Sequence, residues 1–363
     1  MRNATAITAT ARLAVSIALL FGARAAVALP EHFEDPLHTP SEMTPLAAGS
    51  LLEAVVPGGS GLVAVGLRGH ILVQAAGSTS WKQAAVPVSD DLVAVSFPSP
   101  QQGWAVGHDG VVLHTADGGA TWQLQLDGPR AYQTMLSYYQ NAARQGDPAA
   151  AQQVKYLQGV GAGTPAWPFL DVWFRNDQQG YIVGAFGMIM GTTDGGHHWT
   201  PLLDKIDNPR YYHLYSIKGQ GADVFIAGEH GLVLRLDDDA QRFVAKPLSY
   251  HGSLFGIALQ GQRVVAYGLR GHAFVSSDRG DTWTPIDTGT TFGIVGATAL
   301  GDGGLLLATE YGRLLKLAAG DTTAHALGTI TSGAIMGITQ GRDGRIVAAT
   351  SLGPKTADLP SGH

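Results

Sequence analysis

Cysteine is absent from all 363 residues of this chain, and its absence excludes several kinds of site. Without thiols the chain forms no disulfide, has no thiolate nucleophile and has no cysteine ligand for zinc or an iron–sulfur cluster. Its stability must therefore come from a buried core. The chain length and a hydrophobic content of 45% are sufficient for one, because the buried fraction of the surface rises with chain length.

Charge is also scarce, and its balance is acidic. Charged residues make up 14% of the chain, with 29 acidic against 23 basic side chains. Proteins that bind nucleic acid usually have a basic surface that neutralises phosphates, so this balance argues against nucleic acid as a partner. The low charge and the 49 glycines favour a turn-rich β fold over a disordered chain.

One long hydrophobic run occurs, and it lies near the N-terminus. Arg2 and Arg12 come before or at the start of the apolar residues 13–23, and the small residues Ala26-Val27-Ala28 follow. A run of about 11 residues is too short for a membrane-spanning helix, which needs about 20, and the triplet is typical of a cleavage site. We therefore predict a cleaved signal peptide over residues 1–28, with an uncleaved anchor as the alternative.

Cleavage of this segment would remove three arginines and no acid. The mature chain would then carry 20 basic and 29 acidic residues, a net charge of −9. We expect this mature protein in the periplasm, or in a compartment like the thylakoid lumen, with no integral membrane span.

The strongest pattern in the chain is a repeat of about 41 residues. Each copy contains a glycine turn after a short apolar run, at Gly69, Gly110, Gly187, Gly231, Gly271, Gly312 and Gly353. The gap from Gly110 to Gly187 is longer than the others and holds an insertion. Residues 92–126 show four short strand patterns, and a ring of four-stranded sheets is a β-propeller. We predict an all-β fold, a seven-bladed β-propeller of four-stranded blades, as the single domain of residues 29–363.

Three repeats also contain an Asp-box, Ser/Thr-x-Asp-x-Gly-x-x-Trp, at Thr115–Trp122, Thr192–Trp199 and Ser276–Trp283. In such a turn the Asp can accept backbone N–H groups, the Gly takes a positive φ and the Trp packs on the blade. We interpret the Asp and Trp residues as structural: Asp117, Trp122, Asp194, Trp199, Asp278 and Trp283. Blade 1 keeps Trp81 without the Asp, and blade 4 has Phe243 in place of the Trp, as expected of a structural motif.

The last repeat ends near Gly353 without a fourth strand. Met43-Thr44-Pro45-Leu46 is similar to the outer-strand segments that begin at Trp199 and Trp283. We therefore predict that residues 41–48 form the closing strand of blade 7, which would remove an open sheet edge.

The insertion between blades 2 and 3 covers residues 127–168. Residues 131–144 have a helical pattern, Gly146 breaks it, and Asp147-Pro148 is a suitable cap and first turn for a second helix. We predict a helical hairpin here. Its tyrosines either anchor a partner or pack the hairpin against the ring: Tyr132, Tyr138, Tyr139 and Tyr156.

The position of the hairpin selects one side of the ring. In a four-stranded meander, the connection between blades lies on the same side as the turn between the second and third strands. The hairpin should therefore overhang the glycine turns. We predict that this side binds a partner, with solvated turn residues as the alternative. Its candidate residues are Arg68, His108, Asp109, Arg210, Tyr211, Glu229, His230, Arg270, Tyr311 and Arg313.

The Asp-boxes and the turn sequences Val65–His70 and Val106–Gly110 resemble the photosystem II stability/assembly factor family of BNR (Asp-box, sialidase-type) propellers. The resemblance covers nearly all of the mature chain except the hairpin. It implies a non-enzymatic scaffold that binds a membrane-protein subunit during assembly. In members from bacteria without photosystems, it implies a client such as an envelope transporter component. The family carries arginines on one face, and Arg68, Arg270 and Arg313 are the matching positions.

A sialidase-like glycoside hydrolase, or a carbohydrate-binding propeller, is the competing hypothesis. Sialidases combine an arginine cluster with a Tyr that is assisted by a Glu and with an Asp that acts as an acid. The guanidinium group of arginine binds a carboxylate through two parallel hydrogen bonds. The Arg-Ile-Pro segment that opens such enzymes is absent, and adjacent side chains such as Glu310 and Tyr311 tend to diverge on a turn. His197-His198 lacks further ligands for a metal. We therefore predict no catalytic residue, no metal and no cofactor.

Overall fold

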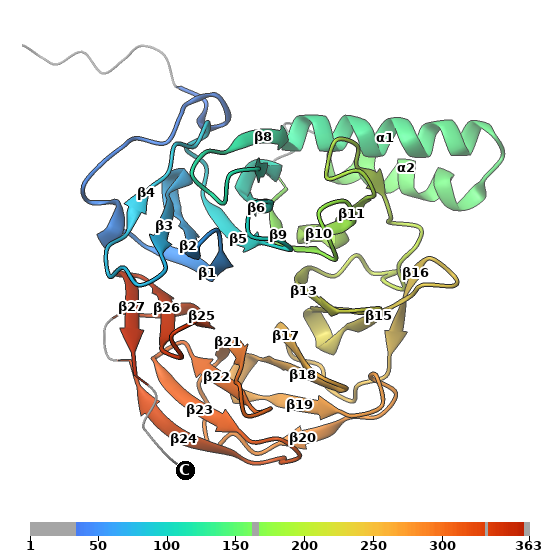
Figure 1. Ribbon diagram of the computed structural model, residues 1–363. Helices are drawn as coiled ribbons and strands as arrows, with labels where there is room; N and C mark the ends of the chain where they lie inside the picture. Colours follow the sequence, from blue (N-terminus) through green and yellow to red (C-terminus); the bar gives the residue numbers. More distant parts are fainter. Residues whose placement is uncertain (1–33, 162–166, 331–332, 359–363) are drawn as a thin grey trace, which may run out of the picture. The chain divides into compact units, whose positions relative to one another are not determined.

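Seven antiparallel sheets form a ring in the computed structural model, and each sheet is one blade of a β-propeller (Figure 1). The structure describes residues 34–161, 167–330 and 333–358. The described residues from Asp35 onward form one compact unit. The predicted seven-bladed propeller with a helical hairpin after blade 2 is confirmed. The predicted signal peptide, residues 1–28, lies outside the described residues.

The first three blades each have four strands. Blade 1 contains β1 (Leu52–Gly58), β2 (Gly61–Gly66), β3 (Ile71–Ala75) and β4 (Lys82–Gln83). Blade 2 contains β5 (Leu92–Ser96), β6 (Gly103–Gly107), β7 (Val112–Thr115) and β8 (Gln123–Leu126). Blade 3 contains β9 (Phe169–Phe174), β10 (Gly180–Gly184), β11 (Ile189–Thr192) and β12 (Thr200–Pro201).

The remaining blades follow the same order from the centre outward. Blade 4 contains β13 (Leu214–Gln220), β14 (Asp223–Gly228), β15 (Val233–Asp237) and β16 (Arg242–Lys246). Blade 5 contains β17 (Leu254–Gln260), β18 (Arg263–Gly268), β19 (Ala273–Ser276) and β20 (Thr284–Ile286). Blade 6 contains β21 (Ile294–Ala299), β22 (Leu305–Thr309), β23 (Arg313–Leu317) and β24 (Ala324–Thr329). Blade 7 contains β25 (Ile335–Gln340), β26 (Ile346–Thr350) and β27 (Gly353–Ala357).

The core lies between neighbouring blades. All residues of β2, β6 and β22 are buried, because sheets cover both faces of these strands. Their sequences are therefore continuous apolar runs rather than alternating ones. Trp104 of blade 2 stacks on Phe174 of blade 3, with ring centroids 3.6 Å apart and an interplanar angle of 10°. Such contacts join each sheet to the next and hold the ring together.

The predicted closing strand is wrong. Among the described residues blade 7 has three strands, and residues 41–48 form no strand of it. They lie instead along blade 1: the Thr44 N–H donates to Gln83 Oε1 (2.9 Å), and Gln83 Nε2 donates to the Glu42 carbonyl (2.8 Å). The Gln83 amide thus satisfies backbone groups that a strand pairing would have used, and Pro45 has no N–H for such a pairing.

Blade 7 is joined to blade 1 by packing rather than by a shared sheet. Val347 and Ala349 of β26 share an apolar cluster with Leu52 of β1 and with Ala47. Ala47 belongs to the short 3-10 helix η2 (Ala47–Gly49), which lies beside β27. The segment before β1 therefore contacts blade 7 only through its last residues. It lies there at the position where, between other neighbouring blades, the chain passes from one blade to the next.

All seven blades repeat one hydrogen bond that fixes the turn after the second strand. The first residue of the turn donates its N–H to the carbonyl of the residue directly before the inner strand of the same blade. The seven donors and acceptors are Leu67 to Leu51, His108 to Asp91, Ala185 to Pro168, Glu229 to His213, Leu269 to Ser253, Glu310 to Gly293 and Ser351 to Ala334. These turns and the connections between blades therefore lie on one side of the ring, which we call the insertion face.

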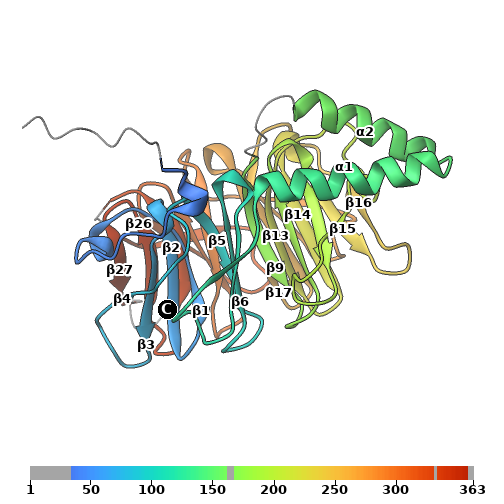
Figure 2. The same ribbon diagram turned by 90° about the horizontal axis from the view of Figure 1, so that it is seen from above.

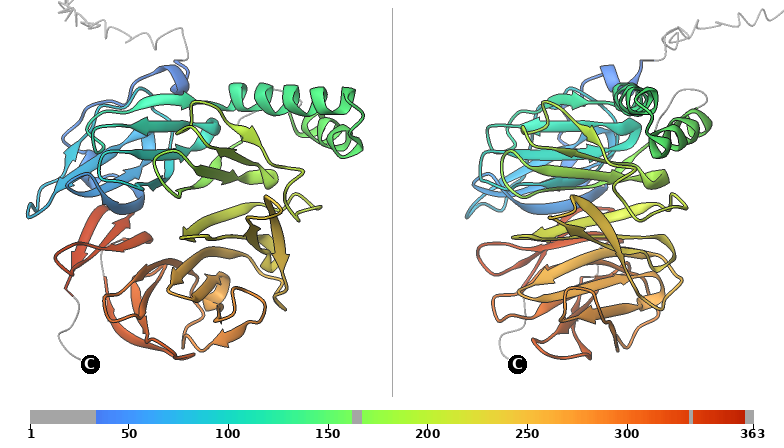
Figure 3. Two further views of the ribbon diagram at one scale, coloured as in Figure 1. Left: turned by 45° about the vertical axis from the view of Figure 1, so that its right-hand side comes forward. Right: turned by 90° about the vertical axis from the view of Figure 1, so that its right-hand side faces the viewer.

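The inserted hairpin consists of α1 (Gly128–Arg144) and α2 (Pro148–Val160). Asp127 caps α1 by accepting the Arg130 N–H, and Asp147 caps α2 by accepting the N–H groups of Ala149 and Ala150. Figure 2 shows both helices at one side of the ring, and Figure 3 shows them extending outward next to blades 2 and 3. The α1 helix contacts the turn at His108–Gly110, so the hairpin lies on the insertion face, as predicted from chain order.

Candidate functional site

Five turns of the insertion face hold a side chain in an unusual backbone conformation. The middle residue of each has a positive φ: Arg68 (55°), Asp109 (51°), Phe186 (56°), His230 (54°) and Arg270 (58°). Residues other than glycine avoid this left-handed region, which carries a steric cost. The hydrogen bond described above and the glycine that follows hold the turn in place. The fold thus presents five side chains of four kinds from equivalent positions on one surface.

The predicted basic residues lie on this face at separate blades. Arg68 and Arg270 are exposed at the tips of the turns in blades 1 and 5. Arg313 is half-buried at the start of β23 and donates to the Gly289 carbonyl (3.2 Å). Arg270 and Arg313 line a common hollow of about 660 Å³ with Phe292. Arg68 is not part of that hollow, so the arginines do not form one cluster.

The insertion face also carries most of the exposed apolar surface. Within the described ranges, eight large apolar or aromatic side chains are exposed, and five of them lie in turns or connections of this face. These five are Phe186, Leu269, Phe292, Tyr311 and Leu352. The other three lie in the segment before β1 or on α1, at Met43, Leu46 and Tyr138. None lies in the loops of the opposite side within those ranges. The exposed large apolar side chains of the described residues are thus unevenly distributed between the two sides of the ring.

The tyrosines of the insertion have mainly a packing role. Tyr139 is buried and donates its hydroxyl to Asp204 (2.8 Å), and Tyr132 packs edge-on against Trp167. Tyr156 stacks on Tyr211, which is one of the residues predicted to bind a partner. The Tyr211 ring is therefore engaged in attaching the hairpin. Only Tyr138 among the hairpin's four tyrosines is exposed.

Arg210 and His230 are brought together through Tyr212. The Arg210 guanidinium donates to the Tyr212 hydroxyl (3.1 Å), and the Tyr212 ring stacks on His230 with centroids 4.6 Å apart. Arg210 and His230 were predicted to bind a partner, whereas Tyr212 was not among the predicted residues. Their proximity arises from the meeting of a connection and a turn that are separate in the sequence.

The acidic turn residues have structural partners. Glu229 accepts the His213 N–H (2.8 Å), and Glu310 accepts the Gly293 N–H (3.0 Å). The Tyr311 ring packs on Phe292, with centroids 4.8 Å apart. Glu310 is thus hydrogen-bonded to the backbone of a connection, and the structure records no hydrogen bond from it to the Tyr311 hydroxyl. This arrangement does not favour the Tyr–Glu pair that the sialidase hypothesis requires.

A pair of carboxyl groups lies where blade 1 meets blade 2. Asp90 is buried, and its Oδ2 has no donor within the described residues. Burial, followed by a hydrogen bond with Asp109 and the charges of Asp109, Asp35 and Asp91, raises the pKa of Asp90 to about 7. Asp109 was predicted to bind a partner. In the structure it interacts with the buried carboxyl group of Asp90.

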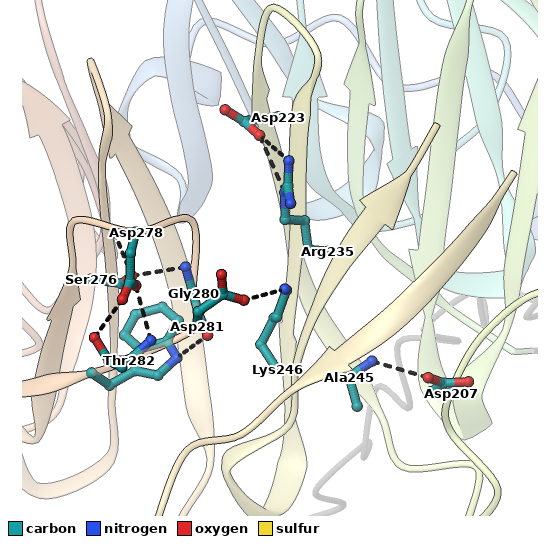
Figure 4. Close-up of polar contacts among 11 residues, drawn as sticks. Asp207, Asp223, Arg235, Ala245, Lys246, Ser276, Asp278, Gly280, Asp281 and Thr282 are labelled. Atoms are coloured by element: carbon teal, nitrogen blue, oxygen red, sulfur yellow. Dashed lines mark hydrogen bonds and ion pairs between the residues drawn. The ribbon is translucent and has the colours of Figure 1, made fainter. Parts of the chain in front are cut away.

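The Asp-boxes lie on the opposite side of the ring from the insertion face. In blade 5 the Thr282 hydroxyl and N–H donate to Asp278 (2.6 and 2.9 Å), while the Gly280 N–H donates to Ser276 Oγ (2.8 Å; Figure 4). Trp283 Nε1 donates to the Gly280 carbonyl (3.0 Å). The first box, Thr115–Trp122, repeats these backbone and Trp hydrogen bonds. The second box, Thr192–Trp199, repeats the backbone bonds, but the structure records no hydrogen-bond partner for its Trp199 Nε1 among the described residues.

Each Asp of the boxes is thus occupied by bonds within its own turn. The Thr282 hydroxyl and N–H, and then Ser276, lower the pKa of Asp278 to about 2. His198 similarly contacts Asp194, with 2.6 Å between Nδ1 and Oδ2. The boxes also join blades: Lys246 of β16 forms an ion pair with Asp281 (2.6 Å; Figure 4). These bonds have the geometry expected of a structural motif.

The centre of the ring holds a cavity of about 360 Å³ lined by all seven inner strands. Asp171 of β9 is buried there and accepts Lys218 Nζ (2.6 and 2.8 Å), Ser216 Oγ and the Ile217 N–H. The Lys218 charge is therefore neutralised within the wall. The cavity was not predicted from the sequence, since its lining residues come two to four at a time from seven separate repeats.

Two further findings concern metals and membranes. Within the described ranges, no group of three or more His, Asp or Glu side chains has an arrangement suited to a metal ion. No helix in the same ranges combines the length and apolar character needed to cross a bilayer.

Comparisons with known proteins identify the family. The family model described as photosynthesis system II assembly factor YCF48 matches residues 73–141 and 153–357, more than half of the chain. The chain belongs to this family. A photosystem II assembly lipoprotein Ycf48 from Synechococcus sp. (strain CC9902) is 26% identical over 186 residues, which are 51% of this chain and 44% of that protein.

Two relatives from Cyanidioschyzon merolae extend the comparison. The chloroplastic photosystem II stability/assembly factor HCF136 of strain NIES-3377 / 10D is 35% identical over 112 residues, covering 29% of this chain and 23% of that protein. The solved structure of YCF48 from this organism has a TM-score of 0.63 at 16% identity, covering 88% of this chain and 99% of that one. The chain thus matches less than half the length of the two curated relatives, Ycf48 from Synechococcus and HCF136. The solved structure of YCF48 shows that the fold is shared.

Proposed function

We propose that this protein is a non-enzymatic assembly factor that binds a segment of a membrane-protein subunit on its insertion face. Membership of the YCF48 family supports the assembly role, because its named relatives are photosystem II assembly proteins. The observation that carries the binding surface is the asymmetry of the exposed apolar side chains. Five of the eight are presented by turns and connections of one face.

The proposed surface consists of apolar tips and separate arginines. Phe292 and Tyr311 contact each other at the edge of the hollow that Arg270 and Arg313 line. Aromatic and arginine side chains commonly provide the main anchors of protein interfaces. The same face carries Arg68, Arg210 and His230, which we include in the surface. Asp109 and Tyr211 would then support it by fixing local structure.

The proposal includes a location outside the cytoplasmic membrane. The predicted signal peptide supports this location, since the short apolar run and small-residue triplet are typical of secretion. The client is a membrane-protein segment of unspecified identity, and an envelope transporter component is one member of that class. Fusion of residues 1–28 to a reporter that is active only after export would test the location.

Charge reversal gives a controlled test of the binding face. Arg270 and Arg279 are both exposed and both have a positive φ, but Arg270 lies on the insertion face and Arg279 in the Asp-box turn of the opposite side. A photoreactive residue at position 311 should crosslink an integral membrane protein in intact cells. The Arg68→Glu/Arg270→Glu variant should lose that crosslink, and Arg279→Glu should retain it.

Either of two results would reject the proposal. Retention of the crosslink in the double variant would show that Arg68 and Arg270 do not bind the client. Equal crosslinking from a photoreactive residue at position 279 would show that the client does not bind selectively to the insertion face. The competing hydrolase hypothesis has its own test. Turnover of a fluorogenic sialoside that disappears in Tyr311→Phe would establish an enzyme instead of a scaffold.

A further inference from the structure

Seven equivalent residues line the central cavity near the start of the inner strands, which is the end closer to the insertion face. Each follows the first buried residue of an inner strand, and each lines the cavity with intermediate exposure. The seven are Glu53, Val93, Leu170, Tyr215, Phe255, Val295 and Met336. The ring therefore has six apolar or aromatic members and one carboxyl group.

Glu53 is the one charged residue among the seven of this ring. The structure records no ion pair and no side-chain hydrogen bond for it within residues 34–161, 167–330 and 333–358. Its charged neighbours are Asp91, which repels a negative charge, and His108, which attracts one. Burial first, and then the charge of Asp91, raise the pKa of Glu53, while His108 lowers it. A partly desolvated carboxylate of this kind favours the approach of a cation.

The other members of the ring suit the rest of a cationic side chain. Tyr215 and Phe255 come from neighbouring blades, with ring centroids 6.1 Å apart in an edge-on arrangement. Aromatic faces attract ammonium and guanidinium groups, and the aliphatic members can contact a methylene chain. The ammonium of Lys218 lies in the same cavity, but Asp171 holds it at 2.6 and 2.8 Å. The wall thus provides one available anion and an apolar lining.

We propose that this ring is a pocket for a single lysine or arginine side chain of the bound segment, with Glu53 as the counter-ion. This inference rests on the proposed function for the origin of the ligand and specifies the chemistry of one of its residues. The insertion face then recognises opposite charges at two places: arginines near its rim contact acidic groups, and the central pocket takes a basic one.

A small amine tests the pocket without any client. The probe is n-pentylammonium, which copies a lysine side chain, and n-pentanol is its neutral counterpart. The Met336 methyl group reports on the ring, and its resonance in ¹³C-methyl-methionine-labelled protein can be assigned with Met336→Leu. At pH 8 the amine should shift this resonance saturably, and the alcohol should bind at least about tenfold more weakly.

Substitution of the carboxylate should remove this preference. Glu53→Gln should weaken amine binding about tenfold while leaving the thermal midpoint of unfolding at or above that of the parent. Glu42→Gln, the same change at an exposed glutamate before β1, should leave amine affinity unchanged. Equal binding of alcohol and amine, or full affinity in Glu53→Gln, would overturn the proposal. Tighter binding of pentanoate than of the amine would also overturn it.

The result is distinguishable from failure of the proposed function. Saturable amine binding that depends on Glu53 establishes the pocket even if crosslinking identifies no membrane protein. Conversely, a crosslink that depends on Arg68 and Arg270, together with no amine binding, would reject the pocket and leave the client surface intact.

Discussion

Tyr156 of α2 and Tyr211 of the connection after blade 3 stack with ring centroids 3.5 Å apart and ring planes 7° apart. The Tyr156 hydroxyl also donates to the Phe186 carbonyl (2.7 Å), and the Tyr211 hydroxyl donates to Gln153 (3.1 Å). The second helix is thus attached to a turn and a connection of the insertion face by one stacked pair and two hydrogen bonds.

Tyr156→Ala should release α2 from the ring without unfolding the propeller. The lost stacking and hydrogen bond should cost about 1–3 kcal/mol locally. Amide hydrogen exchange in residues 148–160 should accelerate, while exchange in β14 and β18 stays unchanged. Tyr156→Phe is the matched control, since it keeps the stacked ring. Uniform acceleration over all blades would show that the pair supports the whole fold instead.

The positive φ of Arg270 makes a prediction about backbone strain. Arg270→Gly should be more stable than Arg270→Ala by about 1 kcal/mol, because only glycine adopts this region freely. Arg279 has the same sign of φ and should show the same order. Arg313 has no positive φ and begins β23, so Gly there should be less stable than Ala. Chemical denaturation of the six variants checks the order.

The raised pKa of Asp90 predicts stability that falls with increasing pH. The pKa of Asp90 is about 7 in the folded state and about 3.9 in the unfolded state. The contribution of protonated Asp90 to the free energy of unfolding is therefore complete below about pH 3.9 and is lost as the pH rises through the folded-state pKa. Asp90→Asn should therefore unfold at a higher temperature than the parent at pH 8. The difference should narrow toward pH 5. A constant difference at both pH values would show that desolvation of the Asp90 charge is not the cause.

The lowered pKa of Asp278 predicts the opposite dependence. Its folded-state value of about 2 lies below the usual range, so its contribution is present above pH 4 and is lost as pH falls toward 2. Asp278→Asn should reduce the difference in stability between pH 5 and pH 3, measured by urea unfolding at each pH. Asp343→Asn provides a comparison outside the Asp-boxes, because the pKa of Asp343 is lowered by its hydrogen bond with Arg345.

Ser276→Ala tests whether the box is a structural unit. The Ser276 hydroxyl accepts the Gly280 N–H (2.8 Å) and donates to Asp278 (2.7 Å), and the glycine amide is buried. Removal of the hydroxyl should cost about 1–3 kcal/mol, because a buried donor loses its partner. Ser276→Thr should retain most of the stability, since Thr occupies this position in the other two boxes. Equal losses in both variants would indicate steric intolerance of the site.

Local patterns in the sequence were sufficient to predict the repeated architecture. The glycine spacing gave seven blades, and the interruption before Phe169 located the hairpin. Asp147-Pro148 marked the start of α2 correctly, because a cap depends on residues next to one another. The start of α1 was predicted three residues late, since the cap at Asp127 followed directly from a strand.

Prediction failed where sequence similarity did not determine pairing. Met43-Thr44-Pro45-Leu46 looks like an outer strand, yet Gln83 binds the backbone of this segment to blade 1. The choice between two neighbouring edges depends on which partner satisfies more backbone groups. That comparison requires the positions of residues about 40 apart in the chain.

The sequence by itself determined the number of blades, the turn chemistry and the place of the inserted helices, because each depends on residues close together in the chain. Only the tertiary structure decided the composition of the central ring, the pairing of Asp90 with Asp109 and the attachment of α2 to Tyr211. Ring closure brings one residue from each of seven repeats to a common axis. Burial then changes the chemistry of Glu53 and Asp90 in ways that their identities in the sequence do not specify.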